Sequence, residues 1–294
     1  MEKSIAFIGV GNMGSRMARR LLSAGYPVKL YDPAADVRRA FDGTSATWAE
    51  SPRDCAASDV IIIMVPGADE IDAVMEGEFG LRHALPKDAS PLLVVMSTVL
   101  PETCVDLQRR VGRSTARVID APVSGGLFGA ESGTLAILAG GETDDIETAM
   151  SVFRHLGKDV FRCGTLGSGQ MAKVANNMLG IANMFGAAEV FKLAASNGLG
   201  LDVLVPILEA GSGRNFASEE VDITRGHYSA WANSREAFES LGHIVRKDLK
   251  LALKLAGNSN LQLPVLEGVS GAIATFTDDL YQRWRDIGYP ADTQ

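Results

Sequence analysis

The chain has 294 residues, 46% of them hydrophobic and 22% charged, which is typical of a folded globular protein long enough for two domains. Its formal net charge of −8 argues against nucleic acid as the main partner, because a phosphate backbone selects basic surfaces. A small anionic substrate is not excluded, since a few local cations can bind it within an acidic protein.

The first half of the chain alternates short apolar runs with helical stretches, the pattern of a parallel sheet covered by helices. The runs at 60–65 and 92–96 are apolar almost throughout, as expected for strands buried on both faces. Strands are predicted at 4–9, 28–31, 60–65, 92–96, 117–119, 134–139 and 160–161, and a helix at 12–24. This half is therefore predicted to be a doubly wound α/β domain.

A G-x-G-x-x-G motif follows the first predicted strand and opens the first predicted helix. Its residues are Gly9, Val10, Gly11, Asn12, Met13 and Gly14. The first glycine allows a tight turn, the second lets the backbone approach a pyrophosphate, and the third lets the helix pack closely on the strand. The amino terminus of the helix offers N–H groups to the phosphates. This order of strand, turn and helix predicts a dinucleotide-binding domain.

Asp32 closes the second predicted strand, about 20 residues beyond the motif. A carboxylate at this position accepts hydrogen bonds from the adenosine ribose hydroxyls and repels the extra phosphate of NADP. The alternative is an aspartate that caps a helix starting at Pro33. No arginine is adjacent to Asp32, so we expect NAD as the cofactor, with NADP as the alternative.

The pattern changes at the glycine-rich segment 164–169, and the sequence beyond it is helical. One long helix is predicted at 170–197, and further helices at 203–210, 237–256 and 264–284. Residues 174–188 include no charged side chain, so we expect this helix to be buried between domains or between subunits. Its Asn176, Asn177 and Asn183 argue against a membrane span.

Four ordered motifs resemble those of the β-hydroxyacid dehydrogenase family, which includes 3-hydroxyisobutyrate dehydrogenases and tartronate semialdehyde reductases. The patterns G-x-G-x-M-G, D-A-P-V-S-G-G, G-x-x-x-K-x-x-x-N and K-D-L-x-L-A occur at residues 9–14, 120–126, 169–177 and 247–252. The resemblance covers nearly the full length. It implies a Rossmann domain at 1–167, an all-α substrate and dimerisation domain at 168–294, and an active site in the cleft between them.

The resemblance implies that Lys173 is the catalytic lysine. Helix geometry gives independent support, because the helical stripe on which Lys173 falls is otherwise uncharged. The other members of this stripe include Asn177, Gly180, Met184 and Phe191. An ammonium group in such a setting loses proton affinity and becomes a usable acid or base near neutral pH. Asn177, one turn further on, is expected to hydrogen-bond the lysine or the substrate hydroxyl.

By the same resemblance, Ser124, Gly125 and Gly126 hold the substrate carboxylate. Ser124 supplies a hydroxyl donor, and the two glycines allow backbone N–H groups to close on an anion. Without the resemblance, this segment would be interpreted as a plain turn at a strand end. Phe238 is expected to form a wall of the substrate pocket.

Val65, Pro66 and Thr98 are expected to line the cofactor groove at the carboxyl ends of their strands, where open α/β sheets bind ligands. The resemblance also places Lys247 near the cofactor, although the residue by itself fits a solvated helix face. Asp248 falls within an apolar arc of the same predicted helix. A buried carboxylate normally needs a partner, so we expect Asp248 to orient a structural part of the protein.

These features predict an oxidoreductase that transfers a hydride between NAD(H) and a small β-hydroxy acid or the matching semialdehyde, with Lys173 as general acid and base. The alternatives are an imine reductase-like enzyme, which has this fold but typically lacks the lysine, and a non-catalytic nucleotide-binding or interaction module. The sequence leaves the individual substrate open.

The remaining expectations concern metals, partners and location. The four histidines show no metal-ligand spacing and no C-x-x-C pair occurs, so we expect no metal. The apolar long helix predicts a homodimer or homotetramer, with neither nucleic acid nor membrane as a partner. Three widely spaced cysteines predict reduced thiols, and a strand starting at Ser4 leaves no room for a signal peptide. We therefore expect a cytoplasmic protein.

Overall fold

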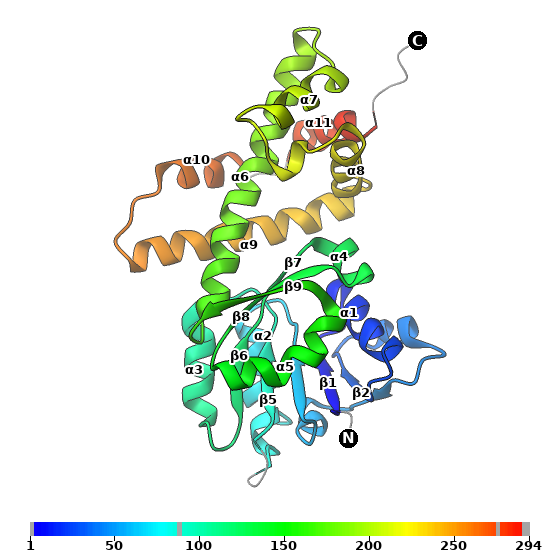
Figure 1. Cartoon of the computed structure of the whole chain (residues 1–294), viewed down its shortest axis with the longest axis vertical. Helices are drawn as coiled ribbons and strands as arrows, with labels where there is room; N and C mark the ends of the chain where they lie inside the picture. Colours follow the sequence, from blue (N-terminus) through cyan, green and yellow to red (C-terminus); the bar gives the residue numbers. More distant parts are fainter. Residues whose placement is uncertain (1–2, 87–89, 275–276, 290–294) are drawn as a thin grey trace. The chain divides into compact units, whose positions relative to one another are not determined.

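The computed structural model describes residues 3–86, 90–274 and 277–289 and divides into two compact units, Met1–Lys173 and Val174–Gln294. The first unit contains a β-sheet with helices, and the second is helical (Figure 1). This arrangement confirms the predicted fold class. The boundary between the units falls within one long helix, α6 (Ser168–Ser196), which begins close to the predicted start at residue 170.

Within the described residues, one nine-stranded sheet has the order β3-β2-β1-β4-β5-β6-β8-β7, and β9 pairs with β8. The strands are β1 (Ile5–Ile8), β2 (Val28–Tyr31), β3 (Thr47–Trp48), β4 (Val60–Ile63), β5 (Leu92–Val95), β6 (Arg117–Asp120), β7 (Val123–Ser124), β8 (Leu135–Gly140) and β9 (Gly157–Gly164). The strands from β3 to β6 are parallel, whereas β8 is antiparallel to β6 and β7. β2 and β3 lie on one side of β1, and β4, β5 and β6 lie on the other. The strand order therefore reverses between β1 and β4, and open α/β sheets bind ligands at such a point.

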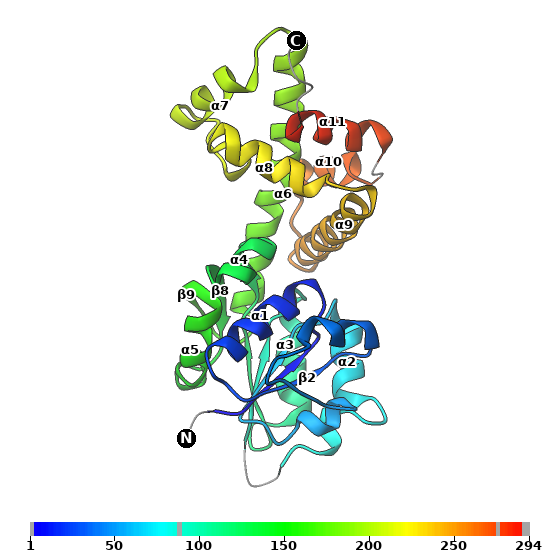
Figure 2. The same cartoon turned by 90° about the vertical axis from the view of Figure 1, so that its right-hand side faces the viewer.

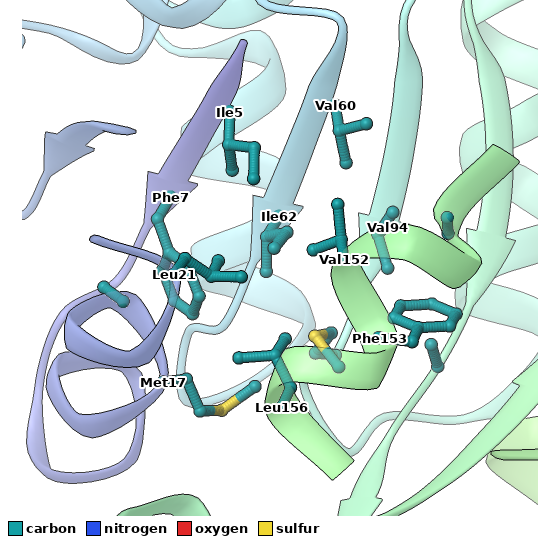
Figure 3. Packing of buried hydrophobic residues seen from close by; sticks show 14 of the residues in the cluster. Ile5, Phe7, Met17, Leu21, Val60, Ile62, Val94, Val152, Phe153 and Leu156 are labelled. Atoms are coloured by element: carbon teal, nitrogen blue, oxygen red, sulfur yellow. The ribbon is translucent and has the colours of Figure 1, made fainter. Parts of the chain in front are cut away.

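Helices cover both faces of the sheet. The face that includes Ile5 and Phe7 packs against α1 (Asn12–Ser23) and α5 (Thr143–Leu156). The opposite face, with Ala6 and Ile8, packs against α2 (Ala68–Glu76) and α3 (Pro101–Val111). Figure 3 shows the first of these contacts: Ile5, Phe7, Ile62 and Val94 from the strands with Met17, Leu21, Phe153 and Leu156 from the helices. Burial on both faces explains why the central strands are continuously apolar.

In the second unit, further helices pack with the segment of α6 that follows Val174 (Figure 2). They are α7 (Leu201–Ala210), α8 (Val221–Trp231), α9 (Arg235–Asn258), α10 (Pro264–Ala272) and α11 (Asp278–Gly288). Their shared core is rich in aromatic side chains, with Tyr228 and Trp284 both fully buried and in edge contact. The hydroxyl of Tyr228 donates to the carbonyl of Met184 in α6 at 2.6 Å, which satisfies its one polar group.

The prediction of one helix at 264–284 was wrong, because two helices occupy that stretch. α10 ends at Ala272, and α11 begins after Thr277, whose hydroxyl accepts a hydrogen bond from the Leu280 amide. Thr277 followed by two aspartates is a recognisable helix start that the sequence analysis missed. Residues 275–276 of the predicted helix lie outside the described residues. The short strands β3 and β7 and the helix α8 were also not predicted.

α6 is only partly buried within the single chain. Leu179 and Leu193 are 62% and 67% exposed, so the expectation of a helix buried around its whole circumference is not met by one copy of the chain. α6 is long and apolar enough for a membrane-spanning helix on those two criteria, which core helices of water-soluble proteins also satisfy.

Candidate active site

The predicted cofactor residues lie where neighbouring parallel strands end. Gly9 follows β1, Asp32 follows β2, Val65 and Pro66 follow β4, and Thr98 follows β5. Because β2, β1, β4 and β5 are adjacent and parallel, these residues share the carboxyl edge of the sheet. The topology therefore brings them to the edge at which dinucleotides bind. Their individual contacts with a cofactor remain predictions.

The glycine motif has the geometry that a pyrophosphate requires. Asn12, Met13 and Gly14 form the first turn of α1, and Gly11 precedes them as a cap residue with no side chain. A Cβ at Gly14 would lie 2.0 Å from the Gly9 carbonyl oxygen, so this glycine is required for close packing. A Cβ at Gly11 would meet nothing within 4 Å, which leaves open space beside the helix amino terminus. The motif thus fits the phosphates of a dinucleotide.

Asp32 organises the loop around the predicted ribose site. Its Oδ2 accepts a hydrogen bond from the amide of Val10 within the glycine motif at 2.8 Å, and its Oδ1 accepts one from the amide of Ala34 at 2.9 Å. The second bond corresponds to the local capping role considered as the alternative. Each carboxylate oxygen has a second lone pair, so the capacity to accept from ribose hydroxyls remains.

Two residues without an assigned role in the sequence analysis join the sheet edge to the start of α6. Gln170 is fully buried, and its side chain accepts from the Val99 amide at 3.0 Å and donates to the Ser97 carbonyl at 2.8 Å. The Ser97 hydroxyl in turn accepts from the Val65 amide at 2.8 Å. The only sequence signal for Gln170 was its position directly after Gly169 in the lysine motif.

Asp120, at the end of β6, binds the amino terminus of α6. Its side chain is fully buried, and its two oxygens accept hydrogen bonds from the amides of Gly167 and Gln170, each at 2.6 Å. Burial raises the pKa of Asp120 to about 6, although these backbone hydrogen bonds favour the charged form and oppose the rise. The carboxylate also complements the positive end of the helix dipole. Asp120 thus fixes where α6 begins.

Gly169 explains one glycine of the lysine motif. A Cβ at this position would lie 2.1 Å from the Leu138 carbonyl oxygen and 2.8 Å from Oδ2 of Asp120. Only glycine therefore allows the first turn of α6 to approach the sheet so closely. Lys173 follows one turn later on α6. Its exposure of 8% agrees with the expectation that it does not lie on a solvated helix face.

Ser124, Gly125 and Gly126 connect β7 to α4 (Gly126–Ser132). Gly125 and Gly126 have φ values of +129° and +63°, a conformation that other residues rarely adopt. Both glycines are exposed. The turn therefore exposes two glycines with positive φ, and its contact with substrate remains a prediction.

In the second unit, Asp248 connects two of the predicted site residues. Asp248 is 6% exposed; its Oδ2 accepts from the side-chain amide of Asn177 at 2.6 Å, and its Oδ1 lies 3.2 Å from the Lys247 ammonium. Asp248 thus has the partner that a buried carboxylate needs, but this partner is Asn177, a predicted site residue, and not the structural group that was expected. Lys247 is thereby tied to the side chain that holds Asn177, and its contact with the cofactor remains a prediction.

Phe238 lies in the aromatic core of the second unit. It is fully buried, with ring centroids 5.3 Å from Tyr281 and 5.4 Å from Trp284. These are packing contacts, and no substrate contact follows from them. The assignment of Phe238 to a pocket wall therefore stays a prediction.

Comparisons with known proteins agree with this architecture. The family model described as the NAD binding domain of 6-phosphogluconate dehydrogenase matches residues 4–165, and that described as NAD-binding of NADP-dependent 3-hydroxyisobutyrate dehydrogenase matches residues 167–286. Mitochondrial 3-hydroxyisobutyrate dehydrogenase of Rattus norvegicus is 36% identical over 90% of this chain and 78% of its own. NAD-dependent L-serine dehydrogenase of Pseudomonas aeruginosa is 35% identical over 90% of this chain and 88% of its own.

A solved structure of Mycobacterium tuberculosis 3-hydroxyisobutyrate dehydrogenase with L-serine superposes with a TM-score of 0.80 at 26% identity, covering 98% of both chains. The fold, the glycine motif and these matches define an NAD(P)-dependent hydroxyacid dehydrogenase. The chain belongs to the β-hydroxyacid dehydrogenase family.

Substitutions at the second and third glycines of the motif should separate packing from cofactor binding. Gly14→Ala should destabilise the fold by at least about 2 kcal/mol, because its Cβ would overlap the Gly9 carbonyl. Gly11→Ala should cost about 1 kcal/mol or less, the price of a poorer helix cap, yet weaken NADH binding at least about tenfold by filling the cradle. Urea denaturation and NADH fluorescence titration measure the two effects. Unchanged NADH affinity in Gly11→Ala would contradict the assignment.

Asp120 should leave a signature in the pH dependence of stability. Its pKa is raised from 3.8 to about 6 by burial, so the folded state binds the proton more tightly than the unfolded state does. The resulting stabilisation is present below about pH 4 and is lost as the pH rises through about 6. Relative to Asp120→Asn, the wild type should therefore lose roughly 1 to 3 kcal/mol between about pH 4.5 and about pH 7. Urea denaturation at several pH values measures this difference, and a constant difference would contradict the prediction.

Proposed function

We propose that this enzyme transfers a hydride between NAD(H) and a small β-hydroxy acid or the matching semialdehyde, with Lys173 as general acid and base. The observation that carries the proposal is a lysine, 8% exposed, followed by fifteen positions without a charged residue at 174–188. The relatives are named for 3-hydroxyisobutyrate and L-serine, both small carboxylic acids with a hydroxyl on the β-carbon.

Lys173 handles the hydroxyl proton in this proposal. In oxidation, its neutral amine accepts the proton of the substrate hydroxyl while the hydrogen on the same carbon departs as hydride. In reduction, its ammonium form donates a proton to the carbonyl oxygen. The nicotinamide ring supplies or accepts the hydride when the cofactor is bound. The low exposure of Lys173 separates it from lysines on a solvated helix face and supports this role.

Asn177 lies one turn beyond Lys173 on α6, and its amide is fixed by the buried carboxylate of Asp248. An amide held in one orientation can position either the lysine or the substrate hydroxyl without losing side-chain entropy during the reaction. We therefore assign Asn177 to the site and Asp248 to the positioning of Asn177.

Ser124, Gly125 and Gly126 are proposed to hold the substrate carboxylate. The positive φ values of both glycines support a turn whose amide groups are free of side-chain obstruction. Fixing the carboxylate orients the β-carbon towards the cofactor. Specificity for NAD over NADP is proposed on the carboxylate of Asp32, which would repel a phosphate on the ribose.

The retained Lys173 disfavours the imine reductase alternative, and the complete set of motifs disfavours a non-catalytic module. A homodimer or homotetramer is proposed from the exposed apolar residues of α6, which a second copy of the chain could cover. A cytoplasmic location is proposed on the three cysteines, none of which forms a disulfide in the described part of the chain.

The test is an assay of NADH and NADPH oxidation and formation against a panel of small β-hydroxy acids, semialdehydes and cyclic imines. We expect turnover of hydroxy acids with NAD(H), and a loss of at least about 10³-fold in kcat for Lys173→Ala. Lys192→Ala is the matched control, because Lys192 lies on the same helix with its side chain 49% exposed, and it should leave kcat unchanged. Turnover that survives in Lys173→Ala would contradict the proposed role, and activity on imines alone would favour the alternative.

A further inference from the structure

A hollow of about 600 Å³ lies along the solvent side of α1, within the first unit. The helix lines it with Ser15, Arg16, Arg19, Arg20 and Ser23, and further lining comes from η1 (Ala35–Phe41), Glu131 of α4 and His155 of α5. α4 and α5 both contact α1 (Figure 2). The buried face of α1 consists of other residues, Gly14, Met17, Ala18 and Leu21. The hollow is therefore separate from the sheet edge that holds the glycine motif.

The hollow holds three guanidinium groups and one carboxylate. Glu131 lies 3.7 Å from Nε of Arg16, and its own side chain is 75% exposed. Among the described residues, Arg19 and Arg20 form no ion pair. Other arginines of the same unit do have a close carboxylate, as where Asp145 binds Arg113 at 2.7 Å and Arg117 at 3.0 Å. The hollow is therefore locally positive although the chain as a whole has a net charge of −8, and a local positive charge attracts anions.

The guanidinium group of Arg20 is held in place before any ligand binds. Arg20 donates from Nε to the His155 carbonyl at 2.8 Å and from Nη1 to the Glu131 carbonyl at 3.2 Å. A Cβ at Gly133 would lie 2.3 Å from Nε of Arg20, which shows how closely the group is packed. Main-chain carbonyls orient the guanidinium without neutralising it, and three of its five N–H donors remain.

Arg16 and Arg19 complete the cationic lining. Arg16 donates to the Asn12 carbonyl at 2.7 Å, while its Nε is buried and, within the described part of the chain, lacks a hydrogen-bond partner. Arg19 is exposed and packs its guanidinium over the ring of Phe41 at 5.6 Å. A partly buried, oriented guanidinium with donors to spare is suited to a tetrahedral oxyanion.

We propose that this hollow, which we term the α1 arginine site, binds the phosphate group of a small molecule or free phosphate, at a place distinct from the cofactor. The guanidinium fork matches phosphate oxygens in pairs, and the Ser23 hydroxyl supplies a further donor. The volume lies in the range of small-molecule sites, so it accommodates a phosphorylated molecule as well as the free ion.

The test is calorimetric titration of the NAD⁺-saturated enzyme, at constant ionic strength, with orthophosphate, pyrophosphate and ribose 5-phosphate. Saturation with NAD⁺ prevents the probes from occupying the cofactor phosphates' place. Saturable binding of at least one probe is expected. Stronger binding of ribose 5-phosphate identifies a phosphorylated molecule as the ligand, and equal or stronger binding of orthophosphate identifies the free ion.

Two variants should shift this binding in opposite directions. Arg19→Gln should weaken it about fivefold, because one cation is removed and no hydrogen bond within the protein is lost. Glu131→Gln should tighten it about threefold, because the one competing carboxylate is removed. Arg109→Gln and Glu78→Gln change the net charge equally at exposed positions elsewhere and should leave affinity unchanged. Absence of saturable binding, or equal effects of the variants and their controls, would overturn the proposal.

Discussion

The candidate active site depends on the hydrogen bonds between the buried carboxylate of Asp120 and the start of α6. This carboxylate accepts hydrogen bonds from two amides at the start of α6 and so joins the end of β6 to that helix terminus. Burial disfavours its charge, while the two short hydrogen bonds and the helix dipole favour it. The raised pKa of about 6 shows that burial prevails. In return for this unfavourable burial, Asp120 gives a defined start to α6, the helix that carries Lys173.

Small residues around Asp120 permit this geometry. Gly140 and Gly169 both lie so close to the carboxylate that a Cβ on either would approach its oxygens within 3 Å. Gln170 then bonds the same turn of α6 to the loop after β5, beside the predicted cofactor groove. The lysine motif, the D-A-P-V-S-G-G motif and residues 97–99 after β5 are thus parts of one hydrogen-bonded network. In the second unit, the buried carboxylate of Asp248 orients the side-chain amide of Asn177 in the same way.

Local patterns in the sequence predicted those features that local chemistry determines. Continuous apolar runs identified the strands β4 and β5, and the glycine motif identified the turn into α1, because each depends on a few adjacent residues. The roles of Asp120 and Gln170 depend on segments about 50 to 70 residues apart, which no spacing rule connects. The α1 arginine site was missed for the same reason, since four segments, α1, η1, α4 and α5, contribute to it. The two-residue strands β3 and β7 carry too little pattern to be recognised.

The central claim is that Lys173 moves the substrate proton, and chemical rescue tests it most directly. Small primary amines added to Lys173→Ala should restore part of the NAD-dependent turnover, with a rate that rises with amine concentration and varies with amine basicity. Tetramethylammonium carries a positive charge without a transferable proton and should restore nothing. Rescue by primary amines alone is the result that the account predicts. Equal rescue by tetramethylammonium, or none by any amine in a folded variant that still binds NADH, would contradict it.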